Sequence, residues 1–300
     1  MNIETNIAAR AMKFKLQRGG VRRAARDKDA EEVIKNLKGD EGQIVSRKLF
    51  QNKSSLVYKY QLKASEMYQY HISQTLPCGD DATRLLKNES YFEYTGKMQQ
   101  YISELDVLKR QIVGDEATYE AVITADITER NTNLYNQGKT STAVHSDYLT
   151  YSQMCDRLYV TWYPEPISTS GDFRWEIPAE MKHRCDEQLN QMLQDAKQDI
   201  YTRMLAPMQA FIDKLAVPIG EQGSIFRDTL VENLTDLVTH LPKLNLDDDP
   251  KITEMIAALK ETTDAYSGNP DILRESPGMR AKAKTDMDAL LKQLTGGYKI

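Results

Sequence analysis

Apolar side chains in this sequence recur mostly three or four residues apart, which is the spacing of one face of an α-helix. The longest such stretch is residues 178–216, with an apolar residue at almost every turn from Met181 onward. Pro178 suits a first helical turn, since the N–H it lacks would have no intrahelical partner there. Pro207 predicts a kink near Met204 rather than an end to the helix. Because a helix of this length cannot bury its apolar stripe alone, other helices must pack along it.

Similar spacing predicts helices along most of the chain. Residues 88–112 show the most regular pattern, with steps of 3-4-3-4-3-4 between apolar positions, which is typical of helices packed nearly antiparallel. Further helices are expected over residues 2–18, 44–76, from the Gly114-Asp115 turn to about Tyr135, over 145–157, and after the capping residues Ser224, Asp249 and Ser276.

One segment, residues 158–177, has a different texture. Its two halves, LYVTWY and DFRWEI, alternate apolar and polar residues and are rich in aromatic and β-branched side chains. They predict one small β-hairpin, the only sheet expected in the chain. A lone hairpin is marginally stable in water, so one face must pack on helices. Trp162, Phe173 and Trp175 are the candidate anchors; the alternative is an exposed protein-interaction patch, and a buried face is the plainer interpretation.

These patterns predict a mainly α-helical protein: an elongated antiparallel helical bundle with long helices and one β-hairpin. Three hundred residues can bury a large core in one or two domains. We expect a basic N-terminal arm or helix over residues 1–40, a bundle core with the inserted hairpin over 41–220, and a C-terminal helical segment over 221–300.

Charge is unevenly spread along the chain. Residues 10–26 carry seven positive charges and no acidic residue, so a total of −5 leaves −12 on the remaining residues. Such a segment is typical of a nucleic-acid-binding arm, of a helix on a membrane surface, or of an N-terminal helix docked on an acidic body or frayed in solution. The last interpretation is favoured, because seven charges make a weak motif. The candidate nucleic-acid-binding residues are Arg10, Lys13, Lys15, Arg18, Arg22, Arg23 and Arg26.

Groups that carry catalysis are not arranged in any recognised motif. HExxH, GxSxG, GxGxxG and a complete Walker motif are all missing from the sequence. Cys185 falls on the apolar stripe, where thiols are normally inert. The acidic run 247–249 resembles a metal-binding cluster, but Asp249 as a helix cap followed by Pro250 explains it without a metal. We therefore expect no catalytic residue, no cofactor and no metal site.

The cellular compartment is indicated by cysteine usage and hydropathy. Three cysteines without a CxxC pattern favour reduced thiols in a cytoplasm, which is the bacterial host cytoplasm if the gene belongs to a phage. No apolar run is long enough to span a membrane, and the N-terminus lacks the apolar segment of a secretory signal.

Several segments follow one another in a characteristic order over about residues 40–240. They are SRKLF, LPCGDD, YFEYTGKMQQY, DFRWEIP, the long helical stretch, and FRDTLVENLTDLV. This order resembles an uncharacterised bacterial and phage family of helical proteins, a domain of unknown function often encoded near MoxR/CobS-like AAA+ ATPases. The family has no catalytic residues to transfer to this chain. The resemblance implies an accessory or scaffolding role near a hexameric ATPase.

We therefore expect a non-enzymatic structural or interaction protein, a phage or bacterial accessory scaffold that assembles with itself or with a protein partner such as an AAA+ ATPase. The alternative is a nucleic-acid-binding protein that uses the basic arm, with tyrosines of residues 44–76 stacking on bases. An enzyme that pairs Cys155 or Cys185 with His145 or His183 ranks third.

Overall fold

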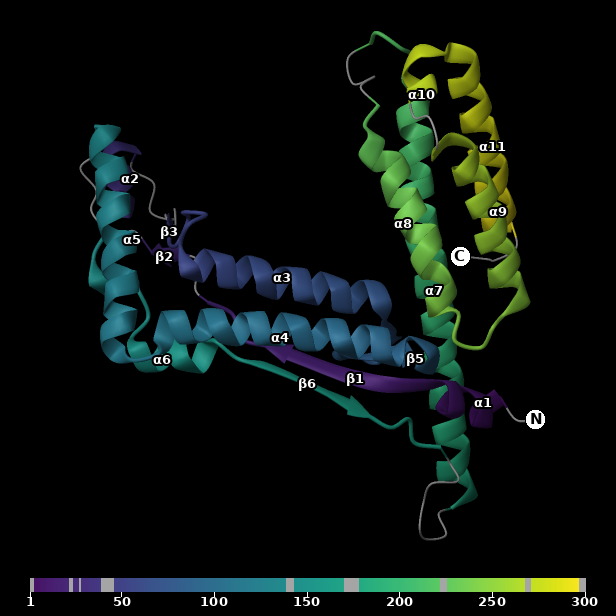
Figure 1. Ribbon diagram of the computed structural model, residues 1–300, viewed down its shortest axis with the longest axis horizontal. Coiled ribbons are helices and arrows are strands. Elements are labelled where there is room, and N and C mark those ends of the chain that lie inside the picture. The colour runs from purple at the N-terminus through teal and green to yellow at the C-terminus, as the bar shows by residue number, and fades with distance from the viewer. Residues whose placement is uncertain are drawn as a thin grey trace. The chain divides into compact units, whose positions relative to one another are not determined.

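The computed structural model in Figure 1 describes residues 3–21, 24–26, 28–38, 46–138, 143–169, 178–221, 226–267 and 271–296. Most of these residues are helical, which confirms the prediction of a mainly α-helical protein. The α-helices are α1 (Ile3–Arg10), α2 (Lys28–Lys38), α3 (Leu56–Gln74), α4 (Tyr91–Val113), α5 (Glu116–Asn136), α6 (Tyr151–Arg157), α7 (Ala179–Ala216), α8 (Asp228–Leu244), α9 (Pro250–Ser267), α10 (Ile272–Glu275) and α11 (Pro277–Gly296). The strands are β1 (Ala11–Arg18), β2 (Ala24–Arg26), β3 (Ser46–Lys48), β4 (Leu76–Cys78), β5 (Asp80–Lys87) and β6 (Val160–Glu165).

The chain divides into two compact units. Unit 1 comprises Met1–Lys15, Ile72–Tyr94 and Tyr163–Ile300, and unit 2 comprises Leu16–His71 and Thr95–Trp162. The boundaries fall inside β1, α3, α4 and β6, so the chain passes between the units in the middle of regular elements. The boundaries expected near residues 40 and 220 do not coincide with these.

Four helices of unit 1 enclose an apolar core. Helix α7 packs against α8 and α11, and α9 packs against the same two helices, as Figure 1 shows. The predicted long helix is confirmed, and it continues through Pro207. Its side chains from Leu189 to Leu215 contribute to the core. The apolar periodicity therefore marks the face of α7 around which this core forms.

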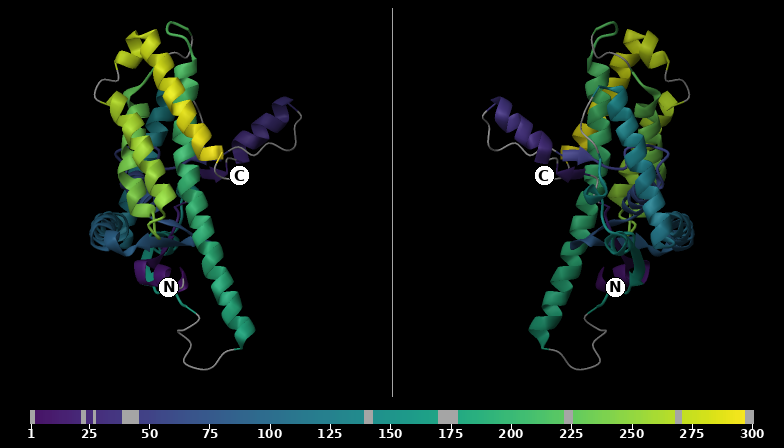
Figure 2. Two further views of the ribbon diagram at one scale, coloured as in Figure 1. Left: turned by 90° about the vertical axis from the view of Figure 1, so that its right-hand side faces the viewer. Right: turned by 90° about the vertical axis from the view of Figure 1, so that its left-hand side faces the viewer.

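The first turns of α7 differ from the prediction. Met181 is 52% exposed and Cys185 is half-buried, and continuous burial of the stripe begins only at Leu189. Figure 2 shows this end of α7 extending away from α8, α9 and α11. Apolar spacing makes a helical face suitable for burial, but that face is buried only where another helix or strand packs beside the same turns.

A four-stranded sheet replaces the single predicted hairpin. Its strand order is β4-β5-β1-β6, and β1 pairs antiparallel with β5, with Phe14 opposite Arg84. Strands β4 and β5 form a hairpin that turns at Gly79, where φ is +74° and glycine is favoured. The first half of the predicted hairpin is observed as β6, which joins β1. The second half, with Phe173 and Trp175, lies outside the described residues.

Two of the predicted helices are wrong over part of their length. Residues 11–18 form β1 instead of continuing a helix over 2–18, and their side chains at Ala11, Phe14 and Leu16 are buried. Residues 46–55 precede α3 rather than belonging to it, and they contain the strand β3. In both places tertiary strand pairing overrides a local pattern that also fits a helix.

Helix starts were predicted more accurately. Asp115 caps α5 by accepting a hydrogen bond from the Thr118 N–H at 2.7 Å. Asp249 accepts from the Lys251 N–H at the start of α9, and Ser276 from the Met279 N–H at the start of α11, which confirms both caps. Ser224, the cap predicted for the next helix, lies outside the described residues, and α8 begins at Asp228 with Arg227 in the capping position.

Arginine side chains bind the carbonyl groups at two helix ends of unit 1. Arg203 donates to the carbonyl oxygens of Ile72, Ser73 and Thr75, just where α3 ends. Arg280, which is buried, donates to the carbonyl oxygens of Lys214 and Leu215 at the end of α7. The last carbonyls of a helix lack the partner one turn further on, so the guanidinium groups supply hydrogen bonds that water would otherwise supply; the Ile72 carbonyl also accepts from the Thr75 N–H.

Gly19 allows two backbone segments of unit 2 to approach closely. Its N–H donates to the carbonyl oxygen of Tyr159 at 3.0 Å. A Cβ atom at Gly19 would lie 1.9 Å from the carbonyl oxygen of Arg157. The neighbouring Gly20 has no atom of the described residues within 4 Å of such a position.

We predict that Gly19→Ala lowers the free energy of unfolding by about 2 kcal/mol or more, because the clash is with backbone and cannot be relieved by a rotamer change. Gly20→Ala is the matched control and is expected to change stability little. Urea denaturation of the full chain followed by circular dichroism measures both. Equal stability of the two variants would contradict the close approach.

Candidate functional site

The predicted basic arm is part of the fold where the structure describes it. Arg10, in unit 1, pairs with Asp248, and Lys13 and Lys15 are half-buried in β1. In unit 2, Arg18 is exposed but lies against α3, as detailed below. Arg22 and Arg23 lie outside the described residues, and so does the side chain of Arg26. Strand β1 lies between β5 and β6 in the sheet, which explains why its cations are not free as an arm.

The other predicted site residues are also only partly described. Of the candidate interaction patch, Trp162 alone is described, and it is half-buried. None of the three cysteines forms a disulfide. His145 and His183, proposed as their partners, instead face the carboxylates of Glu120 and Glu187 at 3.5 and 3.3 Å.

The acidic run 247–249 in unit 1 is paired with cations. Asp248 accepts from the Lys87 ammonium at 2.7 Å, and Lys197 lies 2.7 Å from both Asp247 and Asp249. Lys87 and Arg10 together lower the pKa of Asp248 below its usual 3.8, and the hydrogen bond from Lys87 is the largest cause. Among the described residues, no group of three or more His, Cys, Asp or Glu side chains is arranged to hold a metal ion.

A buried carboxylate in unit 2 fixes the segment that precedes α3. Asp126 of α5 is 5% exposed and accepts hydrogen bonds from the Tyr148 hydroxyl at 2.6 Å and from the Phe50 N–H at 3.2 Å. The Phe50 ring lies edge-on to Tyr148, with ring centroids 5.2 Å apart. Burial, followed by the hydrogen bond to Asp126, raises the pKa of Tyr148 above its usual value. The phenol therefore stays protonated and continues to donate.

Phe50 holds an unusual backbone conformation for this contact. Its φ of +52° lies in the left-handed region, which is uncommon for a bulky side chain. Asn52 adds a second attachment by donating to Glu129 of α5. Strain of this kind costs about 1–3 kcal/mol and persists only where surrounding contacts enforce it. Asp126, Tyr148 and Glu129 supply those contacts.

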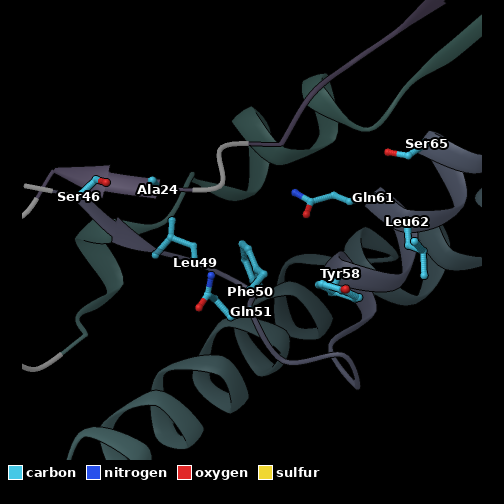
Figure 3. A pocket seen from close by; sticks show the side chains of 9 residues that line it. All are labelled: Ala24, Ser46, Leu49, Phe50, Gln51, Tyr58, Gln61, Leu62 and Ser65. Carbon is cyan, nitrogen blue, oxygen red and sulfur yellow. The ribbon is translucent and has the colours of Figure 1, made fainter. Parts of the chain in front are cut away.

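This strained segment forms one wall of a cavity of about 550 Å³, shown in Figure 3. The opposite wall is one face of α3. The α3 residues that line the cavity follow one another at intervals of three, one and three positions, and they are Tyr58, Gln61, Leu62 and Ser65. The lining residues are Ala24, Ser46, Leu49, Phe50, Gln51, Tyr58, Gln61, Leu62 and Ser65. Leu49 and Phe50 are buried, whereas Leu62 is half exposed.

Gln61 is the polar group at the centre of this arrangement. Figure 3 shows its amide extending from α3 toward the side of the cavity formed by Leu49 and Phe50. The Nε2 atom is buried and has no hydrogen-bond partner among the described residues. A buried amide donor without an acceptor is unfavourable, so this site is suited to an occupant that carries a carbonyl or carboxylate oxygen.

A second cavity of about 220 Å³ adjoins the first and shares Gln61 and Ser65 with it. Its wall includes Arg18, whose guanidinium lies 4.3 Å from the ring centroid of Tyr68 and donates to the Ala64 carbonyl at 3.0 Å. Burial, together with the charge of Asp106, raises the pKa of Tyr60 in this wall to about 12. Arg18 is thus the one charged side chain among the described lining residues of both cavities.

The sequence did not reveal this site because residues 44–55 were expected to be helical. The signal that existed is the i, i+3, i+4, i+7 spacing of Tyr58, Gln61, Leu62 and Ser65, which places a mixed polar and apolar set on one face of α3. The wall opposite this face depends on the contact of Phe50 with Asp126, 76 residues apart in the sequence.

Comparison with known proteins gives no match for this chain among family models, curated proteins or solved structures. The resemblance to the bacterial and phage helical family therefore stays a prediction. Over the described ranges, no helix combines the length and hydropathy that a membrane crossing requires.

We predict that Asp126→Ala lowers the free energy of unfolding by about 2 kcal/mol or more, because it leaves the buried Tyr148 hydroxyl and Phe50 N–H without an acceptor. Asp126→Asn keeps one acceptor oxygen and is expected to cost less. A double-mutant cycle with Tyr148→Phe, measured by denaturation, isolates the side-chain contact. Additive effects of the two substitutions would contradict a direct Asp126–Tyr148 interaction.

A second prediction concerns acid stability and Asp248. Its pKa is lowered in the folded protein, so its ion pairs stabilise the fold above the usual pKa of 3.8, and this contribution is lost as pH falls toward the lowered value. The difference in unfolding free energy between the unmodified chain and Asp248→Asn should therefore shrink between about pH 6 and about pH 3. Asp213→Asn, at an exposed carboxylate, is the control. A difference that grows on acidification would contradict the prediction.

Proposed function

We propose that this chain is a non-enzymatic structural or interaction protein, an accessory scaffold that binds a protein partner or a second copy of itself. The observation that carries the proposal is the pair of adjoining cavities beside α3. They combine apolar walls, a buried amide donor with no acceptor among the described residues and a nearby cation, which is a composition typical of ligand-binding pockets.

The use of charged groups within unit 1 supports the same proposal. Arg203 and Arg280 bind helix-end carbonyls, and the aspartates 247–249 pair with Arg10, Lys87 and Lys197. These groups hold helices and strands in place. Their positions suit a rigid framework that presents binding surfaces.

An AAA+ ATPase is the partner to test first, since it is the one that the family resemblance implies. Nucleic-acid binding through the basic segment is the competing function. The contacts of Arg10 with Asp248 and of Arg18 with Tyr68 and Ala64 weigh against it, because they hold two of the seven cations on the fold.

Mass photometry of the full chain, alone and mixed with the MoxR/CobS-like ATPase encoded nearest to its gene, tests the proposal. We expect a stable complex with the ATPase or a concentration-dependent oligomer of the chain itself. The same samples are titrated with duplex and single-stranded DNA at several salt concentrations. A chain that stays monomeric, ignores the ATPase and binds DNA with a steep salt dependence would favour the nucleic-acid function instead.

A further inference from the structure

The two cavities of unit 2 differ in the chemistry of their walls. The larger has apolar and neutral polar walls, with Leu49, Phe50 and Leu62 among its apolar lining residues. The smaller contains the Arg18 guanidinium. An occupant that fills both must therefore be apolar at one end and negatively charged at the other.

Arg18 retains capacity to bind an anion. A guanidinium has five N–H groups, and the hydrogen bond to the Ala64 carbonyl uses one nitrogen. The Tyr68 ring beneath it fixes the plane of the group. Because a planar guanidinium matches the two oxygens of a carboxylate, an acidic side chain is a well-fitting partner.

Gln61 lies between the apolar end and the charged end of such an occupant, because it lines both cavities. Its buried Nε2 needs an acceptor that the described residues do not supply. A backbone carbonyl placed between an apolar side chain and an acidic side chain would lie at this position. A peptide has such a carbonyl at every residue.

The strands beside the larger cavity favour an extended peptide over a compact molecule. Ala24 of β2 and Ser46 of β3 line it, and β2 and β3 pair only with each other among the described strands. Among the described strands each is therefore an edge strand, and edge strands are where a further strand can add to a sheet. Adding an extended peptide to such an edge, with side chains entering adjacent cavities, is a recurrent mode of peptide recognition.

We propose that these two cavities are the docking site for an extended segment of a partner protein that carries an apolar or aromatic residue close to an acidic residue. The apolar side chain enters the larger cavity, a backbone carbonyl accepts from Gln61 Nε2, and the carboxylate pairs with Arg18. This inference rests on the proposed interaction function and specifies its recognition chemistry. The larger cavity, at about 550 Å³, is within the usual size range of binding pockets.

A phage-displayed library of random linear peptides, selected on the full chain, tests the proposal. The selected peptides should pair an aromatic or aliphatic residue with a nearby Asp or Glu. Their affinities are then measured as synthetic peptides by fluorescence anisotropy. We expect Gln61→Leu, Arg18→Gln and Leu62→Glu each to weaken binding by roughly tenfold or more, since each removes or opposes one predicted contact.

Matched controls lie on α4 of the same unit. Gln111→Leu, Arg110→Gln and Val107→Glu make the same chemical changes at positions outside the two cavities, and they should leave peptide affinity unchanged. Thermal unfolding of all six variants shows whether any loss of binding comes from loss of folding. Equal losses in cavity variants and controls would overturn the site.

Other outcomes also decide the matter. Selection of no binder, selection of peptides without an acidic residue, or undiminished binding to Gln61→Leu would each overturn the proposal. If 4-phenylbutyrate, a free apolar carboxylic acid, binds as tightly as the peptides, the site takes small molecules and the peptide assignment is wrong.

If the cavity variants still form the ATPase complex or the homo-oligomer, the docking site is wrong while the interaction function stands. If the unmodified chain forms neither, the proposed function itself fails.

Discussion

Burial of the apolar stripe of α7 is the interaction on which unit 1 depends. From Leu189 to Leu215 this helix contributes side chains to the core shared with α8, α9 and α11. Each fully buried Leu, Ile, Met or Phe contributes about 1.5–3 kcal/mol, which is more than a typical surface ion pair. The polar contacts follow from this packing, since Arg280 reaches the end of α7 only because α11 lies beside it.

Unit 2 also buries apolar side chains, such as Met67, Met98 and Leu105, but a polar contact fixes the segment that precedes α3. The buried Asp126 carboxylate is stable there because the Tyr148 hydroxyl and the Phe50 N–H both donate to it. These hydrogen bonds hold Phe50 in a left-handed conformation that it would not adopt unaided. The cavity beside α3 is a consequence, since the strained segment is held in place as its wall. Its geometry is therefore set by the framework rather than by an occupant, which is the condition for a preformed site.

Charge pairing separates the residues that build the fold from those that remain for recognition. The run 247–249 is paired with Lys87, Lys197 and Arg10, and these ion pairs link α1, β5 and α7 to the start of α9. Gln61 differs from them, because its buried donor meets no acceptor among the described residues. A polar group that is costly to bury and contributes nothing visible to the fold is a reasonable place to look for binding. Arg18, whose guanidinium has N–H groups left, adds the charge that such a site needs for selectivity.

The local sequence determined the features that depend only on residues a few positions apart in the chain. Regular apolar spacing predicted α4 and α7, the Gly114-Asp115 turn predicted the start of α5, and capping side chains predicted the starts of α9 and α11, because a helix closes its hydrogen bonds within four residues. Strand β1 was missed, since it depends on a partner about 70 residues away, as in the pairing of Phe14 with Arg84. The β4–β5 hairpin was missed although its strands are neighbours in the sequence. The cavity was missed for the same reason as β1: its wall depends on the contact of Phe50 with Asp126. Only the tertiary structure brings such distant groups together, because strand pairing and buried hydrogen bonds gain their energy from partners that no local pattern identifies.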